Sequence, residues 1–392
     1  MFKINYTLSQ HHHDIIHYKE CSMQKLLYIT DQEEYVDHSF IAPLFEVYLQ
    51  KYIHVDIVYF TEFKSDFTCK ENHHFIVPSR YKNILFKELS CNQIDIYSYD
   101  FVMVRNNIKL MQYVLKYRDT YGYKALYRFS FPKRKVQIKC EEAQGKNQFL
   151  NRCIHAIQTK KETKIINNCD AFLPTSARMH KHYLPHVYIP TILCPPAINP
   201  EALHPHQQHK EETIHFVYVG TLDKLRSFET ILDAFDLLKN KAWKLSISTR
   251  DVAFAYKLLE HYPAIRNQIH LYNAKTKDAL LSLIAASDIG IALLPDIPIY
   301  STSTPVKVFD YYTSGVPSLM SHSSHTTTIF TDDIDAWFCD FDTQEIANKL
   351  NYLLTLSHEE IAAIGAKGQQ RLLEVKNYEM VAQNIAQQLK AL

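Results

Sequence analysis

Glycine is scarce in this chain: 7 of the 392 residues are glycine, whereas an average protein contains about 7%. Neither of the glycine-rich phosphate loops, G-x-G-x-x-G or G-x-x-x-x-G-K-[ST], occurs in the sequence. So few glycines also exclude a collagen-like chain and an architecture of many tight hairpins. Any phosphate group that the protein binds must therefore be held by other means.

Paired cysteines and long apolar runs are lacking as well. The eight cysteines include no C-x-x-C pair, which excludes a zinc ribbon and a regular disulfide framework. We interpret them as small buried side chains of a protein in a reducing compartment. The sequence has no apolar signal segment, and no stretch approaches the roughly 18 apolar residues of a membrane-spanning helix. These absences predict a cytoplasmic protein, with peripheral contact to the inner face of the cell membrane left open.

The net charge of +1 hides a separation of charge along the chain. Residues 101–200 carry 17 Lys and Arg against 5 Asp and Glu, and the blocks on either side are acidic. A basic block favours an anionic partner, such as a phosphorylated acceptor or a membrane surface. A solvated basic face without a partner explains the block equally well. Nucleic acid is disfavoured, because no nucleic-acid-binding motif accompanies the charge.

Strand and helix patterns alternate in two stretches of similar length. Short apolar runs such as KLLYIT and HVDIVYFT alternate with helical stretches, a Pro- and His-rich linker follows near 194–214, and the alternation restarts at HFVYV. This pattern predicts two Rossmann-like, doubly wound α/β domains with a ligand cleft at the carboxyl ends of the strands. We predict an N-terminal extension over 1–22, a first domain over 23–205, a second over 206–375, and a C-terminal helix over 376–392 that docks back on the first domain.

The stretch YSTSTPVKVFDYYTSGVP, residues 300–317, contains the signals of a short helix. Thr304 fits the N-cap, Pro305 the first helical position and Gly315 the position after the end, which predicts a helix over about 305–313.

The predicted helix start has the chemistry of a nucleotide site. Amide groups from Ser303 to Lys307, at the positive end of the helix dipole, could hold a diphosphate without a glycine-rich loop. Asp310 lies on the same helix face, where a carboxylate can accept hydrogen bonds from the vicinal hydroxyls of a ribose. A capped helix with one solvated ion pair is the plain alternative.

Three strings in the second half match the motifs of a known family in order. STPVKVFDYYTSGVPSLMS is similar to a Pro-x-Lys-x-x-Glu-Tyr, then Gly-x-Pro signature. FVYVGTLDKLRSFETILDAF resembles a strand, a glycine and a phosphate-contacting basic residue, and IHLYNAKTKDALLSLIAASDIGIALLP resembles a base-binding loop. On these motifs, residues 214–375 resemble the donor-binding domain of retaining family 4 glycosyltransferases with the GT-B fold. The match is thinner in the first half, where CDAFLPTSARMHKHYL resembles a strand-Ser-helix passage.

The resemblance implies roles for individual residues. Gly220 falls where the backbone passes close to the sugar diphosphate, and Asp310 takes the position of the acid that binds the ribose. Arg226 and Lys307 are the implied catalytic residues, since cations stabilise the charge that grows on the leaving diphosphate without a metal. No cofactor is implied: the nucleotide-sugar is a substrate, and its base is not identified.

The sequence also departs from the family pattern. Thr302 stands where the family often has a second acid, Thr221 stands where it often has a basic residue, and Ser227 replaces a glycine. The candidate substrate-binding residues on the donor side are Gly220, Thr221, Thr302, Ser303, Thr304 and Asp310, with no metal ligand among them.

An aromatic and basic string lies inside the basic block. In ALYRFSFPKRK, Tyr127, Phe129 and Phe131 share one face of a predicted strand. The cations beside them suit a lipid-linked phosphate acceptor or the inner leaflet of the membrane. A core strand followed by a solvated loop is the alternative. The candidate acceptor or membrane residues are Arg128, Lys133, Arg134 and Lys135.

We therefore expect a hexosyltransferase-type enzyme that moves a sugar from a nucleotide-sugar donor to a cell-envelope glycan or a lipid-linked acceptor. Retention, metal independence and a role in polysaccharide or lipopolysaccharide biosynthesis follow from the resemblance alone. A catalytically silent GT-B partner subunit of a heteromeric transferase is one alternative. A GT-B sugar-nucleotide epimerase is another, and it would require paired acid and base residues in the first domain. The histidine strings HHHDIIH and HPHQQH support no more than adventitious metal binding.

Overall fold

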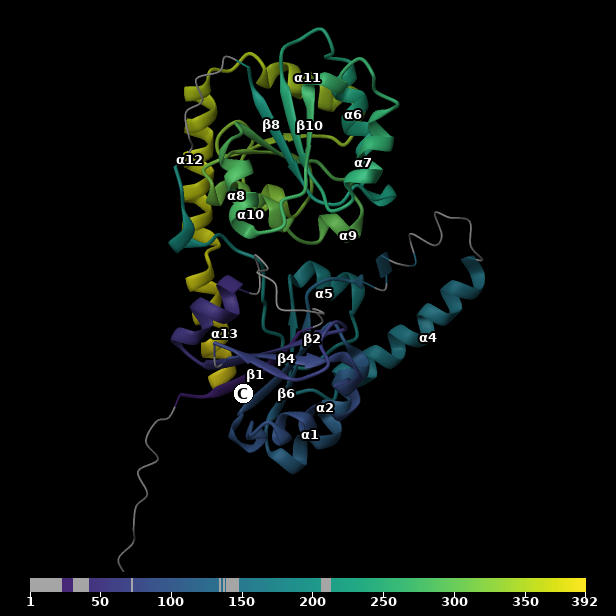
Figure 1. Ribbon diagram of the computed structural model, residues 1–392, viewed down its shortest axis with the longest axis vertical. Coiled ribbons are helices and arrows are strands. Elements are labelled where there is room, and N and C mark those ends of the chain that lie inside the picture. The colour runs from purple at the N-terminus through teal and green to yellow at the C-terminus, as the bar shows by residue number, and fades with distance from the viewer. Residues whose placement is uncertain are drawn as a thin grey trace, which may run out of the picture.

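Parallel strands form the centre of both halves of the molecule. One sheet has the strand order β3-β4-β2-β1-β5-β6-β7 and the other β10-β9-β8-β11-β12-β13, and β3 pairs antiparallel with β4. Figure 1 shows the two domains stacked along the long axis. The prediction of two doubly wound α/β domains is confirmed. The computed structural model describes residues 23–30, 42–71, 73–133, 135–136, 138, 148–205 and 213–392.

The first sheet is buried on both faces. Successive residues of its strands contribute to two separate cores: Leu27 and Ile29 lie in one, and Leu26 and Tyr28 in the other. This is why the strands read as continuous apolar runs. The strands are β1 (Lys25–Ile29), β2 (His54–Thr61), β3 (Thr68–Lys70), β4 (His74–Pro78), β5 (Phe101–Arg105), β6 (Lys124–Phe129) and β7 (Ala171–Pro174). The main helices are η1 (Ala42–Tyr48), η2 (Leu49–Lys51), α1 (Leu85–Cys91), α2 (Ile108–Tyr121), α4 (Gln148–Ile166) and α5 (Ala177–Tyr183).

The second sheet is covered in the same way. Its strands are β8 (His215–Val219), β9 (Lys244–Ser248), β10 (Ile269–Tyr272), β11 (Ile289–Ala292), β12 (Ser318–Ser321) and β13 (Trp337–Cys339). Its helices are α6 (Phe228–Asp236), α7 (Val252–Leu259), α8 (Lys277–Ala285), α9 (Pro298–Ser301), α10 (Val306–Thr313), α11 (Thr343–Leu353) and α12 (His358–Val375). In Figure 1, α12 lies on the left of the second domain and α6 and α7 lie on the right.

Two of the scarce glycines fix the position of α10. A Cβ atom on Gly290 would lie 2.3 Å from the Tyr311 ring, and one on Gly368 would lie 2.2 Å from the Tyr312 ring. Both tyrosine rings therefore pack directly against a glycine backbone, and a side chain at either glycine would displace the ring. The Tyr311 hydroxyl also accepts from the amide of Val219 at 3.1 Å, so the helix is tied to the end of β8.

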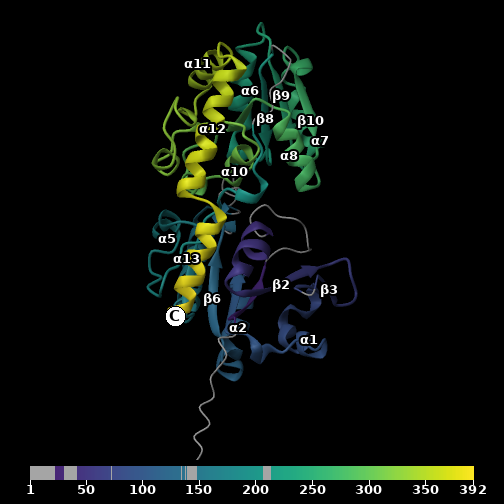
Figure 2. The same ribbon diagram turned by 90° about the vertical axis from the view of Figure 1, so that its left-hand side faces the viewer.

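Helix α13 (Tyr378–Lys390) returns to the first domain. It continues the line of α12 across the domain boundary, as Figures 1 and 2 show. The two chain crossings are hydrogen-bonded to each other, since the amide of Ile198 donates to Lys376 O at 3.0 Å and that of Tyr378 to Ile198 O at 3.1 Å. An apolar stripe on α13 packs into the first domain and comprises Tyr378, Val381, Ala382, Ile385, Ala386 and Leu389.

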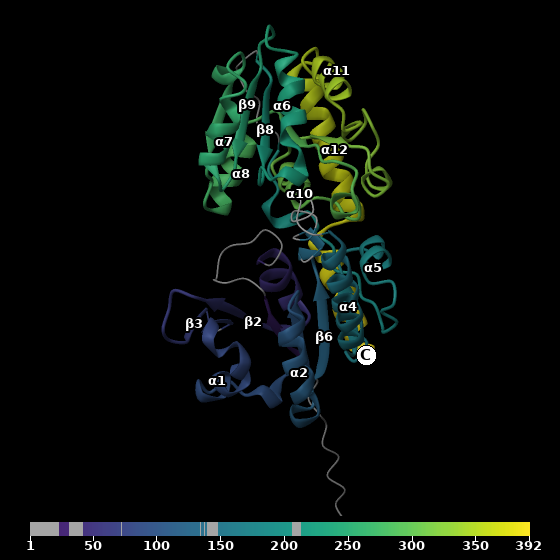
Figure 3. The ribbon, with the colours of Figure 1, turned by 90° about the vertical axis from the view of Figure 1, so that its right-hand side faces the viewer.

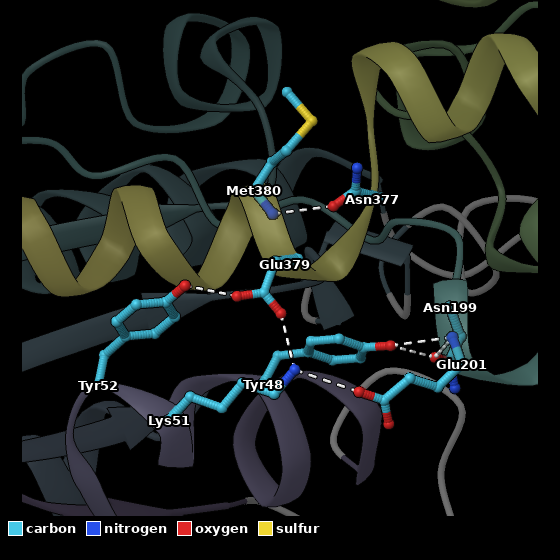
Figure 4. Close-up of polar contacts among 8 residues, drawn as sticks. All are labelled: Tyr48, Lys51, Tyr52, Asn199, Glu201, Asn377, Glu379 and Met380. Carbon is cyan, nitrogen blue, oxygen red and sulfur yellow. Dashed lines mark hydrogen bonds and ion pairs between the residues drawn. The ribbon is translucent and has the colours of Figure 1, made fainter.

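Polar contacts hold α13 and the interdomain segment to η1 and η2 (Figure 4). The Lys51 ammonium lies 2.8 Å from a Glu379 oxygen and 3.1 Å from a Glu201 oxygen. The Tyr48 hydroxyl donates to Asn199 Oδ1 at 2.7 Å and accepts from the Glu201 amide at 3.1 Å. One buried tyrosine therefore satisfies two groups of the segment that links the domains.

The described cysteines do not all match the expectation of burial. Cys169, Cys194 and Cys339 are buried, whereas Cys69 and Cys91 are exposed, and these five are free thiols. Within the described part of the chain, no helix is long and apolar enough to cross a membrane.

Tyr48→Phe should lower the free energy of unfolding by about 1–3 kcal/mol, since it removes two hydrogen bonds and leaves Asn199 Oδ1 and the Glu201 amide bonded only to each other. Chemical denaturation checks this value. Tyr97→Phe is the matched control, because Tyr97 is 66% exposed and a surface change of this kind costs at most about 0.5 kcal/mol. Equal stability of the two variants would contradict the assignment.

Candidate functional site

A cleft of about 530 Å³ lies between the two domains. Its lining residues follow the carboxyl ends of β5, β6 and β7 in the first domain and of β8 and β11 in the second. Five cations and one acid are among the described residues that line it, so the cleft favours an anionic ligand. The charged and hydroxyl lining residues are Arg105, Arg128, Ser130, Lys133, Thr175, Arg226, Tyr300, Ser303, Thr304, Lys307 and Asp310.

Gly220 directly follows β8 and lies beside two cationic groups. Its φ of +144° lies in the region that favours glycine. A Cβ atom there would lie 3.5 Å from Arg226 Nη1 and 3.6 Å from Lys307 Nζ. The backbone at Gly220 therefore leaves the space in front of both cations open.

Lys307 is a buried cation that pairs with no carboxylate in the described part of the chain. Its side chain is 7% exposed, and Nζ lies 3.7 Å from the centroid of the Tyr218 ring. Among the described residues, Nζ has no hydrogen-bond partner. Burial, and secondarily the charge of Arg226, lowers the pKa of the Lys307 ammonium well below its usual value. An anion bound at this point would stabilise the charged form of the buried lysine.

Arg226 is held in place by its own turn. It closes η6 (Lys224–Arg226), and its Nε donates to Asp223 Oδ2 at 2.9 Å. Its guanidinium lies over the Tyr300 ring at 5.4 Å. The next residue, Ser227, has φ +46° and ψ +51°, so the backbone keeps the left-handed shape that suits a glycine at this position.

The hydroxyl residues of the predicted site have different environments. Thr221 donates to Asp223 Oδ2 at 3.0 Å, and the Thr302 hydroxyl donates to Pro298 O at 2.7 Å. Neither is among the described residues that line the cleft, whereas Ser303 and Thr304 are. The Thr302 carbonyl also accepts from Ser176 Oγ of the first domain at 2.5 Å, so Thr302 lies at a domain contact.

The prediction that Thr304 caps α10 is wrong. Pro305 is the N-cap residue and the helix begins at Val306. The Thr304 hydroxyl is buried and has no hydrogen-bond partner in the described part of the chain. Pro305 has an extended ψ of 136°, so the helix starts one residue later than the sequence pattern indicates. The other end agrees with the prediction: Gly315, at φ +72°, follows the C-cap.

Asp310 faces the cleft on α10 and is paired. One carboxylate oxygen lies 2.5 Å from Nζ of Lys277, in the first turn of α8. Both side chains are mostly buried, which is where such a pair keeps a fixed geometry. Lys277 was not among the predicted site residues, because nothing in the sequence places it opposite Asp310.

The basic acceptor residues separate in the structure. Arg128 is 1% exposed, and its guanidinium donates to Leu173 O at 2.9 Å and to Cys194 O at 2.7 Å. The prediction of membrane contact by Arg128 is therefore wrong: this cation is buried in the wall of the cleft. Lys133 is exposed and lines the cleft, and Lys135 donates to Thr159 Oγ1 at 2.8 Å. Arg134 lies outside the described residues.

The first domain also contributes polar residues that were not predicted. Asn106 follows β5 with φ +51°, a conformation that non-glycine residues adopt rarely. Its side chain donates to Ser130 Oγ at 2.7 Å and accepts from the Ser130 amide at 2.9 Å, and Arg105 Nε donates to the same Oγ at 2.9 Å. Polar residues directly after a buried strand are the signal that could have found this cluster.

The arrangement of two Rossmann-like domains around an electropositive cleft defines a GT-B fold. Residues 233–387 match the family model described as glycosyl transferase-like. No curated protein matches the sequence. The likeness to GT-B glycosyltransferases is thus confirmed, and the family match in the second half together with the fold indicates a glycosyltransferase enzyme.

Solved structures agree with this fold over nearly the whole chain. Sucrose-phosphate synthase from Thermosynechococcus elongatus has a TM-score of 0.71 at 14% identity, with 94% of this chain and 99% of that chain covered. HepE of Anabaena in complex with UDP and glucose has a TM-score of 0.65 at 11% identity, covering 94% and 100%. The lipopolysaccharide outer core galactosyltransferase WaaB has a TM-score of 0.59 at 13% identity, covering 94% and 99%.

Lys307→Ala and Arg226→Ala should each weaken binding of a nucleoside diphosphate by about 1–3 kcal/mol, the scale of a charge-assisted hydrogen bond. Calorimetry with UDP, GDP and ADP measures the change. Lys224→Ala is the matched control, because Lys224 lies exposed in the same turn as Arg226. Full affinity in both cleft variants would contradict the site.

Affinity for the nucleoside diphosphate should fall as pH rises. Burial lowers the pKa of Lys307, so the free protein loses this charge at a lower pH than an ordinary lysine does. Above that pKa, binding must take up one proton, and affinity then falls by up to about tenfold per pH unit. Titration calorimetry over a pH series tests this dependence. Lys307→Met should abolish it; the same slope in the variant would assign the proton to another group.

Proposed function

We propose that the protein transfers a sugar from a nucleotide-sugar donor to a glycan or a lipid-linked acceptor, with retention and without a metal. The observation that carries the proposal is the buried Lys307 ammonium, which has no hydrogen-bond partner among the described residues and lies beside Arg226 at the backbone of Gly220. Two cations at one point suit a diphosphate whose charge increases as it leaves. In this proposal the Asp310 carboxylate, which also pairs with Lys277, accepts a hydrogen bond from a ribose hydroxyl.

In the proposed reaction, the bond between the anomeric carbon and the diphosphate oxygen breaks and a bond to the acceptor hydroxyl forms. The hydroxyl proton leaves with the diphosphate. The residues of this chain bind and orient the two substrates and stabilise the leaving group. Arg105, Asn106 and Ser130 form a cluster on the first domain, across the cleft from Arg226 and Lys307. In the proposed reaction this cluster positions the acceptor.

A silent partner subunit is the second candidate function. It is favoured by Thr302, whose hydroxyl is used inside the second domain and which replaces an acid of the family pattern. An epimerase is disfavoured, because the described first-domain residues that line the cleft include no carboxylate.

A screen of the pure protein separates these functions. Thermal shift against UDP-, GDP-, ADP- and CMP-sugars should identify the base, and sugar transfer or slow donor hydrolysis should follow with the same nucleotide. Release of nucleoside diphosphate that is lost in Lys307→Ala supports the transferase. Binding without any turnover would support the silent subunit, and the absence of binding would overturn the proposal.

Asn106→Ala should lower kcat about tenfold or more, because a displaced acceptor reacts far more slowly. Affinity for the nucleoside diphosphate should not change, since the substitution lies on the other domain. Asn106→Gly is the matched control for backbone strain, because glycine accepts the positive φ of this position. A similar loss of kcat in both variants indicates a role of the side chain, and unchanged kcat in both would remove Asn106 from the site.

We further propose a peripheral location on the cytoplasmic face of the cell membrane. Helix α4 projects from the first domain in Figure 1 and toward the viewer in Figure 3. It exposes Ile154 and Ile157, 41% and 68% exposed, and the cations of Lys160, Lys161 and Lys164. Exposed apolar side chains next to lysines suit an anionic lipid surface. A pathway of envelope polysaccharide or lipopolysaccharide synthesis fits such a location.

Lys160→Glu/Lys161→Glu should abolish sedimentation with vesicles that contain anionic lipid, and added salt should weaken binding of the unchanged protein. Lys239→Glu/Lys257→Glu makes the same change of charge on exposed residues of the second domain and should bind normally. Failure of the unchanged protein to sediment would remove the membrane proposal and leave the transferase proposal intact.

A further inference from the structure

Three metal-ligating side chains converge at the amino-terminal edge of the first sheet. Nε2 of His54 lies 3.2 Å from Asp56 Oδ1, and Nδ1 of His73 lies 3.1 Å from the same oxygen. All three ligand atoms lie within 4.8 Å of one another. His54 and Asp56 are two residues apart on β2, so both point to one face of the strand. His73 precedes β4 and comes from the turn of the β3–β4 hairpin.

The carboxylate at the centre of this cluster is fixed from behind. The Tyr99 hydroxyl donates to Asp56 Oδ2 at 2.6 Å, and both residues are buried. This leaves Oδ1 directed at the two imidazoles. A buried hydroxyl that orients a ligating carboxylate is the arrangement that metal sites use around their ligands.

We propose that His54, Asp56 and His73 form a divalent-metal site, with zinc as the preferred ion. Ligands about 2.0–2.1 Å from a tetrahedral zinc ion lie roughly 3.3 Å apart, close to the 3.1 and 3.2 Å separations here. Two nitrogens and one oxygen suit zinc better than magnesium or calcium. Solvent takes the fourth position, because the two imidazoles are 33% and 41% exposed.

The site is remote from the cleft. β2 has eight residues and begins at His54, and it runs parallel to the strands whose carboxyl ends line the cleft. At about 3.3 Å per residue, the metal lies roughly 23 Å from the far end of this strand. The ion would join the start of β2 to the hairpin before β4 and, through Tyr99, to the segment before β5. It stabilises the first domain and takes no part in sugar transfer.

Zinc titration of the full-length protein, after removal of metal with a chelator, tests the proposal. Competition with a chromophoric chelator gives the affinity of each site. The control variant replaces His11, His12 and His13 by alanine and should keep one site of unchanged affinity, whereas His73→Ala should weaken that site by at least tenfold. Tyr99→Phe should weaken it about 10–100-fold, as loss of a group that orients a ligand does.

The outcomes are distinct. The proposal is supported if the control variant retains the site and His73→Ala loses it. Zinc should also raise the Tm of the unchanged protein but not that of His73→Ala. With Co²⁺ as the probe, intense visible absorption indicates a tetrahedral site. Loss of all binding in the control variant, or equal binding by His73→Ala and the unchanged protein, would overturn it. Nucleotide binding by His73→Ala should remain normal, so this test is independent of the proposed transferase activity.

Discussion

The donor half of the cleft depends on the ammonium group of Lys307, which is buried on a tyrosine ring and has no hydrogen-bonded carboxylate among the described residues. Burial of an unpaired charge is costly, and the ring of Tyr218 offsets only part of that cost for Lys307. A diphosphate that binds beside the ammonium group would offset the rest of this cost. The position of the ammonium group is fixed because α10 is clamped, with Tyr311 packed directly on Gly290. Gly220 then keeps the space in front of the cation open.

The same cleft depends on how the chain crosses between the domains. Both crossings run side by side, joined by hydrogen bonds between Ile198 and the segment around Lys376. Helix α13 buries its apolar stripe in the first domain although it follows α12 of the second. Contacts around Tyr48 and Lys51 tie the linker and α13 to the first domain on this side of the molecule.

Much of the fold could be predicted from local pattern, and part of the site could not. A strand with Tyr127, Phe129 and Phe131 on one face was expected; Tyr127 and Phe129 are buried on β6, but the strand ends at Phe129 and Phe131 lies beyond it, 38% exposed. Arg128 was expected to contact an acceptor or the membrane. A doubly wound sheet is covered on both faces, so Arg128, which points to the opposite face from Tyr127 and Phe129, is buried too. Carbonyl groups of β7 and of the linker satisfy its charge. Chain-distant partners of this kind leave no mark on local sequence.

The sequence by itself determined the two α/β domains, the helix with Lys307 and Asp310, and the glycosyltransferase resemblance, because strand periodicity, helix ends and ordered motifs are local properties. Only the tertiary structure decided that the Lys307 ammonium is buried without a hydrogen-bond partner among the described residues and that Lys277 pairs with Asp310. It also brought His73 to the carboxylate of Asp56. These contacts depend on sheet register and helix packing, which join residues that are far apart in the chain. The scarcity of glycine excluded a glycine-rich phosphate loop, and the fold brought Arg226 and Lys307 together beside Gly220.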